Sequence, residues 1–211
     1  MISAGGQEIE AKFYVKNLQR VRDHLERAGA RLIQSRVLET NLRFDLPGAP
    51  MRAEGRVLRL RQDREVRLTY KSASTNENGV LSREEIEFTV EDFEQARRFL
   101  EALGYQKLVY YEKYRTIYEL NETAIMLDEL PYGSFVEIEG ETSTSIRALA
   151  GLLELNWEAA IGSSYHALFD RVLRNRGLST EDLSFANFVG IQVSAEDLEV
   201  VVADRSDSLS Y

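Results

Sequence analysis

Strand-like segments with one charged face and one apolar face constrain this chain more than any other feature of its sequence. The tripeptide Glu-Ile-Glu occurs three times, at residues 8–10, 85–87 and 137–139. Because successive side chains of a β-strand point to opposite faces, each copy places two carboxylates on one face and an isoleucine on the other. Basic residues alternate with apolar residues in the same way in the segments 58–61, 66–71 and 113–115. These segments are therefore predicted to be two-faced strands.

If these strands form one closed sheet, their charged faces can point either outward to solvent or inward into a polar lumen. Buried charges cost several kcal/mol each, so they persist only when they are paired or bound to a metal. An inward arrangement gathers Arg, Lys, Glu and Asp side chains in one interior, which suits a metal-bound polyphosphate. The joint pattern, with both signs of charge on matched faces, favours the inward arrangement.

Length and composition set wide limits on the class of protein. The 211 residues suffice for one barrel-type domain with a good core. The chain has no cysteine, which excludes disulfides, thiolate zinc sites and cysteine nucleophiles. No apolar run approaches the ~18 residues that span a bilayer, and residues 1–7 lack the features of a signal peptide. A net charge of −9 argues against general DNA binding. We expect a cytoplasmic protein without a membrane partner.

The order of the predicted elements is typical of an α+β protein with a mainly antiparallel sheet. Helices are expected from Asn17 to Gly29 and from Asp92 to Gly104, followed by a helical pair at 145–155 and 163–176. Turns are expected at residues 47–50 and 74–79. Strands are expected at residues 7–14, 31–46, 55–73, 80–90, 106–120, 123–130 and 136–141. Because the helices are few, we expect them to pack on the outside of a barrel.

A series of motifs resembles a known family over about residues 7–175. Glu8-Ile9-Glu10-Ala11-Lys12 is similar to the ExExK signature of the CYTH superfamily, the triphosphate tunnel metalloenzymes. Further matching segments follow in the family order at residues 58–61, 68–71, 83–87, 112–115, 125–128 and 135–140. The resemblance implies an eight-stranded antiparallel β-barrel tunnel with a charged lumen.

The resemblance also implies roles for particular charged residues. The basic positions, expected to bind the triphosphate and to take part in catalysis, are Lys12, Arg59, Arg61, Lys71, Lys113 and Arg115. Arg offers forked donors to phosphate oxygens, whereas Lys acts as a point charge. The acidic positions of the family's metal sites are Glu8, Glu10, Asp128, Glu137 and Glu139. Because all of these ligands are oxygens, Mg²⁺ or Mn²⁺ fits better than zinc.

Glu85 and Glu87 are also expected at the substrate-binding site. Two roles are open for them, since they can organise the basic residues or contact a metal through water.

Three functions are compatible with this pattern. The first is a metal-dependent phosphohydrolase, in which water attacks the terminal phosphorus of inorganic triphosphate, a nucleoside triphosphate or thiamine triphosphate. The alternative is a class IV adenylyl cyclase, in which the 3′-hydroxyl of ATP attacks the α-phosphorus and pyrophosphate leaves. A sensor that binds polyphosphate without turnover is disfavoured by the complete motif set. The natural triphosphate, the choice between Mg²⁺ and Mn²⁺, and a homodimeric state stay open.

The C-terminal residues differ in composition from the rest of the chain. Residues 178–211 contain seven acidic side chains and one basic side chain. We therefore expect residues 1–177 to form the CYTH triphosphate tunnel domain and residues 178–211 to form an acidic extension that is partly disordered. Its apolar stretch, residues 185–191, is suited to docking on the barrel, whereas residues 204–211 are expected to be mobile.

Overall fold

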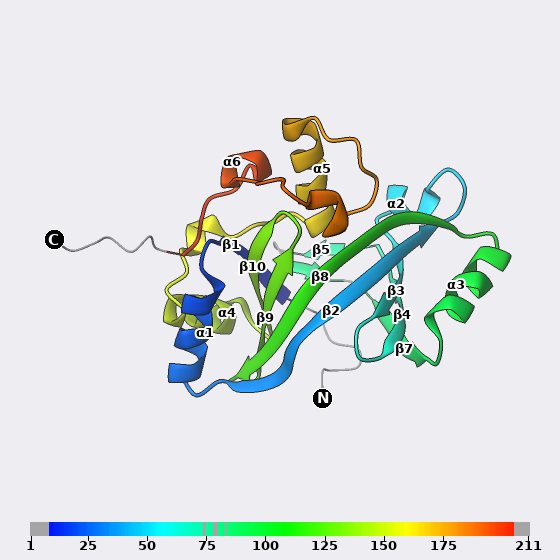
Figure 1. Cartoon of the computed structure of the whole chain (residues 1–211). Helices are drawn as coiled ribbons and strands as arrows, with labels where there is room; N and C mark the ends of the chain where they lie inside the picture. Colours follow the sequence, from blue (N-terminus) through cyan, green and yellow to red (C-terminus); the bar gives the residue numbers. More distant parts are fainter. Residues whose placement is uncertain (1–8, 74, 78–79, 83, 205–211) are drawn as a thin grey trace. The chain divides into compact units, whose positions relative to one another are not determined.

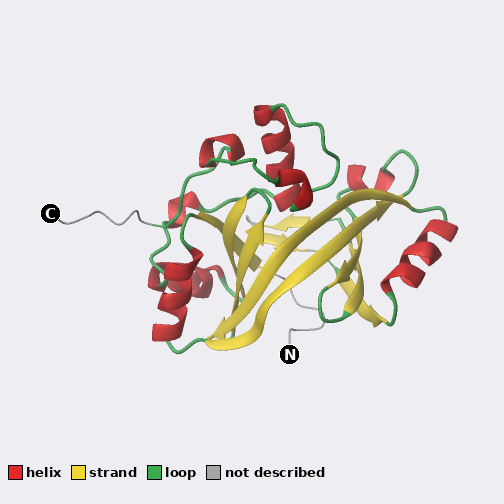
Figure 2. Cartoon of the chain, viewed as in Figure 1, coloured by secondary structure: helices red, strands yellow, loops and turns green. Residues whose placement is uncertain are grey.

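The computed structural model describes residues 9–73, 75–77, 80–82 and 84–204. Its main sheet has eight strands in the order β1-β10-β9-β8-β2-β3-β4-β7. Their bounds are β1 Ile9–Val15, β2 Arg31–Asp45, β3 Val57–Gln62, β4 Val66–Lys71, β7 Glu85–Val90, β8 Gln106–Leu120, β9 Thr123–Leu130 and β10 Gly133–Gly140. Strands β5 (Thr75–Glu77) and β6 (Val80–Ser82) form a separate two-stranded sheet. Figures 1 and 2 show the two long strands β2 and β8 side by side.

The strand pairing confirms the predicted fold class. Antiparallel registers join β1 to β10, β10 to β9, β9 to β8, β2 to β3, β3 to β4 and β4 to β7. Together with the helices they make an α+β fold with an eight-stranded antiparallel sheet. In the described residues the sheet ends at β1 and β7, and no backbone hydrogen bonds close it. This order is compatible with the expected tunnel.

The helices begin and end at residues that satisfy their free backbone groups. They are α1 Leu18–Arg27, α2 Pro50–Ala53, α3 Phe93–Ala102, α4 Ser143–Leu152, α5 Tyr165–Arg176 and α6 Ala195–Leu198, with 3-10 turns η1 Trp157–Ala159 and η2 Ala186–Phe188. Asn17 caps α1 and Asp92 caps α3, each accepting a backbone N–H of the first turn. Gly177 ends α5 in the left-handed conformation that glycine adopts without strain.

The chain divides into two compact units. Unit 1 contains the described residues of 37–113 together with 181–184, and unit 2 contains 9–36, 114–180 and 185–204. The division falls within β2 and within β8, so both strands contribute to both units. Each unit has a core of its own.

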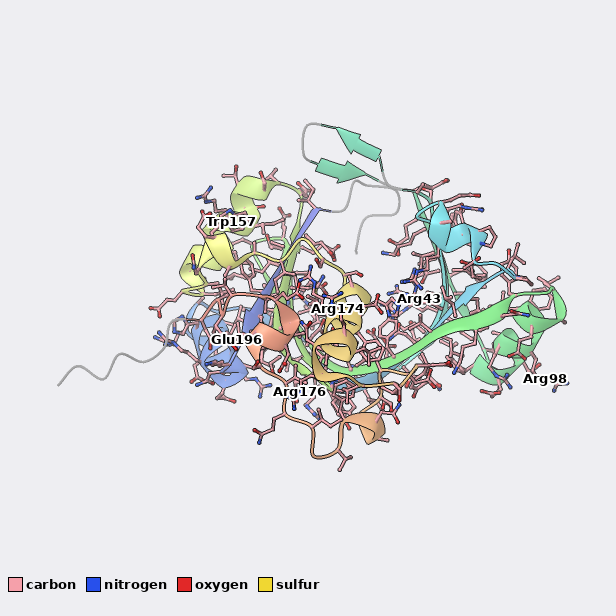
Figure 3. All side chains as sticks on the ribbon, turned by 90° about the horizontal axis from the view of Figure 1, so that it is seen from above. Arg43, Arg98, Trp157, Arg174, Arg176 and Glu196 are labelled. Carbon is pink, nitrogen blue, oxygen red and sulfur yellow. The ribbon has the colours of Figure 1, made fainter. Side chains whose placement is uncertain are left out.

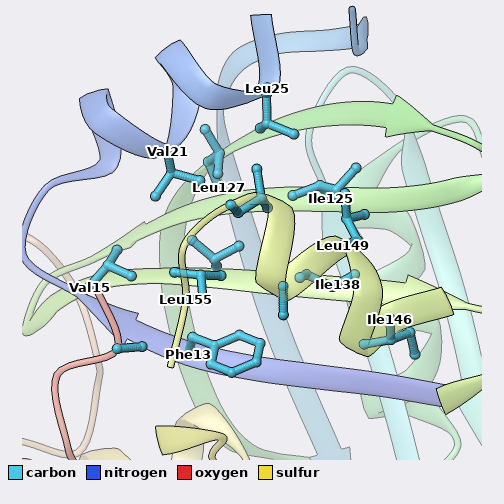
Figure 4. Packing of buried hydrophobic residues seen from close by; sticks show 14 of the residues in the cluster. Phe13, Val15, Val21, Leu25, Ile125, Leu127, Ile138, Ile146, Leu149 and Leu155 are labelled. Carbon is cyan, nitrogen blue, oxygen red and sulfur yellow. The ribbon is translucent and has the colours of Figure 1, made fainter. Parts of the chain in front are cut away.

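The core of unit 2 fills the space between its strands and two helices (Figure 4). Phe13 from β1, Ile125 from β9 and Ile138 from β10 are fully buried. Leu25 of α1 and Ile146 of α4 pack in the same cluster. The apolar faces of these strands therefore pack against helices, as predicted, and their charged faces lie on the other side of the same strands.

The core of unit 1 is built in the same way around α3 and α2. Leu60 of β3 is fully buried, and it clusters with Phe44 of β2, Met51 of α2 and Leu100 of α3. Figure 2 shows α3 beside the strands of this unit. Arg98, labelled in Figure 3, lies on the exposed face of the same helix.

The structure corrects three predicted local elements. The segment 55–73 is two strands, because the Asp63 carboxylate accepts the Glu65 N–H at 3.0 Å and closes a turn between them. In the predicted turn at 47–50, Pro50 instead begins α2, whose first amides are satisfied by Asp45, which accepts from Met51 N at 3.0 Å. Strand β5 lies inside the predicted turn 74–79, and the predicted strand 80–90 is divided into β6 and β7. The dipeptide Asn-Gly at 78–79 favours hairpins, but these two residues lie outside the described part of the chain.

The C-terminal segment is packed as far as the structure describes it. Leu183 exchanges backbone hydrogen bonds with Tyr110 and Glu112 in unit 1. Phe188 and Leu198 are buried in unit 2. Asp204 accepts the backbone N–H groups of residues 16 and 17 at 2.9 Å each. The segment predicted to be mobile, residues 204–211, thus begins with a residue that is held in place, and its other positions, 205–211, lie outside the described residues.

Among the helices that the structure describes, none combines the length and the apolar character required to cross a membrane.

Candidate functional site

The structure distributes the predicted site residues over the two units. In unit 1 lie Arg59, Arg61, Lys71, Glu85, Glu87 and Lys113, and in unit 2 lie Glu10, Lys12, Arg115, Asp128, Glu137 and Glu139. Glu8, the first predicted metal ligand, lies outside the described residues. One unit therefore carries most of the basic positions, and the other carries the described metal-site positions.

The acidic face of unit 2 is assembled by the register of β1, β10 and β9. Glu10 is directly opposite Glu139, and Lys12 is directly opposite Glu137. Asp128 enters the same face from β9, opposite Arg115 of β8. Like charges directly opposite one another destabilise a sheet, and the Lys12 ammonium, 3.6 Å from Glu10 Oε1, places a positive charge beside this pair.

Arg115 holds two buried carboxylates of this face. Its Nε and Nη2 donate to Asp128 Oδ1 and Oδ2, each at 2.6 Å, in a bidentate pair. The same Nη2 also donates to Glu137 Oε2. Asp128 is 0% exposed and Glu137 is 6% exposed. Two carboxylates therefore converge on one nitrogen of the positively charged guanidinium group.

Lys12 is the second protein cation of the acidic face. Its Nζ lies 2.9 Å from Glu137 Oε1 and 3.6 Å from Glu10 Oε1. Burial acts to lower the pKa of Lys12, but attraction to Glu137 and Glu10 outweighs it and raises the pKa above the ordinary 10.5. The ammonium group is therefore held in its charged form.

On the basic face of unit 1, positive charges lie directly opposite one another. Arg43 of β2 is directly opposite Arg59 of β3, and Arg61 of β3 is directly opposite Arg67 of β4. Burial, followed by repulsion from Arg59, lowers the pKa of the Arg61 guanidinium, although Glu39 acts in the opposite direction. Such a face gains from an anion that lies against it.

Two hydrogen-bond donors on the basic face have no acceptor among the described residues. Within the described residues, the Nε atoms of Arg59 and Arg61 are buried and have no hydrogen-bond partner. Buried polar groups in folded proteins are nearly always satisfied, so an acceptor beside these two donors would be stabilised. Phosphate oxygens match the forked geometry of the guanidinium group.

Glu85 and Glu87 both contact basic residues of unit 1. Glu85 Oε2 lies 2.7 Å from the Lys71 ammonium, and Glu87 Oε1 lies 3.3 Å from Arg61 Nη2. Thr69 donates to Glu87 Oε2 at 2.7 Å. These contacts favour the first of the two predicted roles, in which the pair organises the basic residues.

Sequence reasoning missed two residues of unit 1 that face the predicted basic positions. Glu39 is 2% exposed, and its carboxylate lies 3.7 Å from Lys113 Nζ and 4.0 Å from Arg61 Nη1. Arg43, labelled in Figure 3, adds a guanidinium to the same face. Both alternate with Leu42 and Phe44 of β2, so the pattern that indicated the other strands was present here as well.

The acidic face of unit 2 fits a divalent cation in its chemistry. All of the carboxylates offer hard oxygen ligands, which Mg²⁺ and Mn²⁺ prefer. Among the residues that the structure describes, no three carboxylate or imidazole side chains form a ready metal cluster. Arg115 and Lys12 instead lie among the carboxylates, and the convergence of Asp128 and Glu137 on Arg115 Nη2 shows that this face can gather two oxygen ligands on one cation.

Comparisons with known proteins agree with these observations. The sequence profile of the CYTH domain matches residues 6–164. A protein of Methanocaldococcus jannaschii, described as a candidate adenylate cyclase, is 28% identical over 138 residues, which cover 64% of this chain and 78% of that protein. The structure of a candidate adenylate cyclase from Vibrio parahaemolyticus is similar, with a TM-score of 0.68 at 21% identity, covering 79% of this chain and 99% of that one.

A further similar structure comes from Hippeastrum. It belongs to a candidate adenylyl cyclase that is described as having a dominant triphosphatase activity, and its TM-score is 0.51 at 19% identity. The similarity covers 92% of this chain and 100% of that one. Because the CYTH profile spans well over half of the sequence and includes the charged strands of both units, this chain belongs to the CYTH domain family.

Proposed function

We propose that this protein hydrolyses a triphosphate with the help of a divalent cation. The observation that carries the proposal is the pairing of like charges on opposed strands: arginines face arginines in unit 1, and Glu10 faces Glu139 in unit 2. Opposed like charges repel one another, and protein groups of opposite sign, Glu87 beside Arg61 and Lys12 beside Glu10, already lie next to these pairs. A phosphate anion on the first face and a metal cation on the second would reduce both repulsions further.

The chain's own residues have separable tasks in this proposal. Arg59 and Arg61 bind phosphate oxygens through their guanidinium groups, whose Nε–H donors have no acceptor among the described residues. Lys71 and Lys113 add positive charge that offsets the charge on the transferred and leaving phosphates. Glu10, Asp128, Glu137 and Glu139 would hold Mg²⁺ or Mn²⁺ (with Glu8, on the strength of the family resemblance). A cation held there would supply Lewis-acid chemistry and lower the pKa of a bound water.

Relatives of this chain support both hydrolysis and cyclisation as outcomes. The M. jannaschii relative is described as a candidate adenylate cyclase. The Hippeastrum protein also carries a cyclase name, yet its described dominant activity is that of a triphosphatase. We therefore place hydrolysis first and adenylyl cyclisation second.

A product assay distinguishes the two reactions. The protein is incubated with Mg²⁺ or Mn²⁺ and with inorganic triphosphate, ATP or thiamine triphosphate in turn. Release of inorganic phosphate supports the hydrolase, whereas equal amounts of pyrophosphate and cyclic AMP from ATP would support the cyclase. If no substrate is turned over with either metal, the proposal is wrong.

Matched arginine variants connect the activity to the basic face. Arg59→Ala removes a donor at the predicted phosphate site, and we expect kcat/KM to fall by about 10²-fold or more. Arg98→Ala removes an exposed guanidinium on the outer face of α3 and should leave kcat/KM within about twofold. Equal losses in the two variants would mean that charge in general, and not this face, governs the reaction.

A further inference from the structure

Tyr165, the first residue of α5, contacts the acidic face from outside the strand motifs. Its hydroxyl donates to Asp128 Oδ2 at 2.8 Å, across 37 residues of sequence. A tyrosine hydroxyl is protonated at neutral pH, so Tyr165 is the donor and the carboxylate is the acceptor. The sequence around Tyr165 has no charge alternation, so no strand pattern indicates this contact.

Tyr165 completes the set of bonds that fixes the plane of the Asp128 carboxylate. Arg115 binds both carboxylate oxygens from one side, in the bidentate geometry described above. Tyr165 adds a third bond, to the oxygen that already accepts from Arg115 Nη2. A carboxylate held by three donors from two elements cannot rotate freely about its terminal bond.

The position of the Tyr165 ring is itself fixed from several directions. Ser164 caps α5 by accepting the N–H of Ala167, and the Tyr165 carbonyl accepts the Tyr132 hydroxyl at 2.8 Å. The ring packs edge-on against Phe135, with the centroids 5.1 Å apart. The Lys12 ammonium lies 4.5 Å from the ring centroid, within the range of a cation–π interaction. The start of α5 thus contacts both a carboxylate and a cation of the acidic face.

We propose that Tyr165 is a positioning residue that orients the Asp128 carboxylate for a divalent cation. The proposal rests on the proposed function, because it needs the acidic face to bind a metal. Residues that hydrogen-bond to a metal ligand set the direction of its lone pairs, and losing one typically weakens metal affinity by about 10–100-fold. The Tyr165 hydroxyl donates to the Asp128 carboxylate, and through that carboxylate Tyr165 would act on a bound metal.

The test measures Mn²⁺ binding directly, in the absence of substrate. Tyr165→Phe removes the hydroxyl but keeps the ring, its packing on Phe135 and its contact with Lys12. We expect the Kd for Mn²⁺, measured by electron paramagnetic resonance or calorimetry on the full chain, to rise by about 10–100-fold. Thermal unfolding in the presence of a chelator reports whether the variant is folded.

Tyr118→Phe is the matched control. It also removes one hydroxyl from a buried tyrosine of unit 2, but Tyr118 belongs to the helix-facing core and not to the acidic face. We expect the Kd for Mn²⁺ of this variant to stay within about twofold of the parent value.

A double variant tests whether Tyr165 acts through Asp128. In an Asp128→Asn background, adding Tyr165→Phe should change the Kd by less than about twofold, because residues that act through one another give non-additive effects. Equal effects in both backgrounds would overturn the proposal.

Two further results separate this proposal from the proposed function. If the parent protein binds Mn²⁺ and releases phosphate while Tyr165→Phe binds Mn²⁺ equally well, the positioning role is wrong and the proposed function stands. If the parent protein neither binds Mn²⁺ nor turns over a triphosphate, both are wrong.

Discussion

Removing the Arg115 guanidinium should show how much the stability of the metal-free protein depends on this positive charge among the carboxylates of the acidic face. Arg115→Met keeps most of the side-chain volume but leaves Asp128, which is 0% exposed, without its bidentate partner. Breaking a buried ion pair by removing one partner costs about 3–5 kcal/mol, because the remaining charge stays buried without compensation. We therefore expect a large fall in the free energy of unfolding when no metal is bound.

The loss of unfolding free energy should be smaller when the negative charge of Asp128 is removed together with Arg115. In Arg115→Met/Asp128→Asn the buried carboxylate becomes a neutral amide, so we expect the cost to fall below about 2 kcal/mol. Saturating Mn²⁺ should also restore part of the stability of Arg115→Met, because a metal ion can take the place of the guanidinium.

Urea denaturation followed by circular dichroism, with a chelator present, measures these differences. For a denaturant slope of about 2 kcal/mol per molar urea, the expected loss moves the midpoint by roughly 2 M. Arg174→Met is the matched control, since Arg174 is an exposed residue of α5 (Figure 3) whose partner Glu199 lies 2.7 Å away. An exposed pair is worth at most about 1 kcal/mol. Equal midpoint shifts in the two variants would refute the reasoning.

Three other perturbations have defined outcomes. Glu139→Gln removes one of two opposed carboxylates and should weaken Mn²⁺ binding while the protein stays folded; melting curves recorded with chelator and with Mn²⁺ check that the stabilisation by Mn²⁺ becomes smaller. Phe188→Ala should cost about 3–5 kcal/mol, whereas Val189→Ala, at a side chain that is 82% exposed, should cost little in the same urea assay. Folding raises the pKa of Lys12, so the ion pairs of its ammonium stabilise the folded state fully below the unfolded pKa of about 10.5. This stabilisation should be lost as the pH rises through the higher folded pKa. The difference in unfolding free energy between the parent and Lys12→Met should therefore stay constant from pH 7 to 9 and shrink only in more alkaline solution.

Alternation along the chain predicted the long strands and most of the charged faces. The bounds of β8 and β9 agree with the predicted 106–120 and 123–130, because the joining residues Asn121 and Glu122 both adopt the positive φ that a tight hairpin requires. The strand predicted over residues 55–73 lacks the break between β3 and β4, since Asp63 closes that turn with its side chain and residues 63–65 contain neither glycine nor proline. Such a turn has no strong compositional signal.

The candidate site was only partly predictable for a related reason. Glu39 and Arg43 follow the same alternation as the predicted strands and could have been found by applying it to β2. Tyr165 could not have been found in this way, because its contact with Asp128 depends on where α5 packs against the strands. Periodicity determines which residues share a face, but it contains no information about the helix that meets that face.

The pairing of β1 with β10 has a consequence for folding during synthesis on the ribosome. Strands β3, β4 and β7 are near neighbours in sequence and can pair soon after they emerge. Strand β1 is made first, yet its partner includes Glu137 and Glu139, which are synthesised more than a hundred residues later. Synthesis at about 5–20 residues per second leaves the N-terminal strand without its partner for several seconds or longer. During that interval β1 presents an open strand edge, so the nascent chain should be most prone to misassociation before residue 140 has left the exit tunnel.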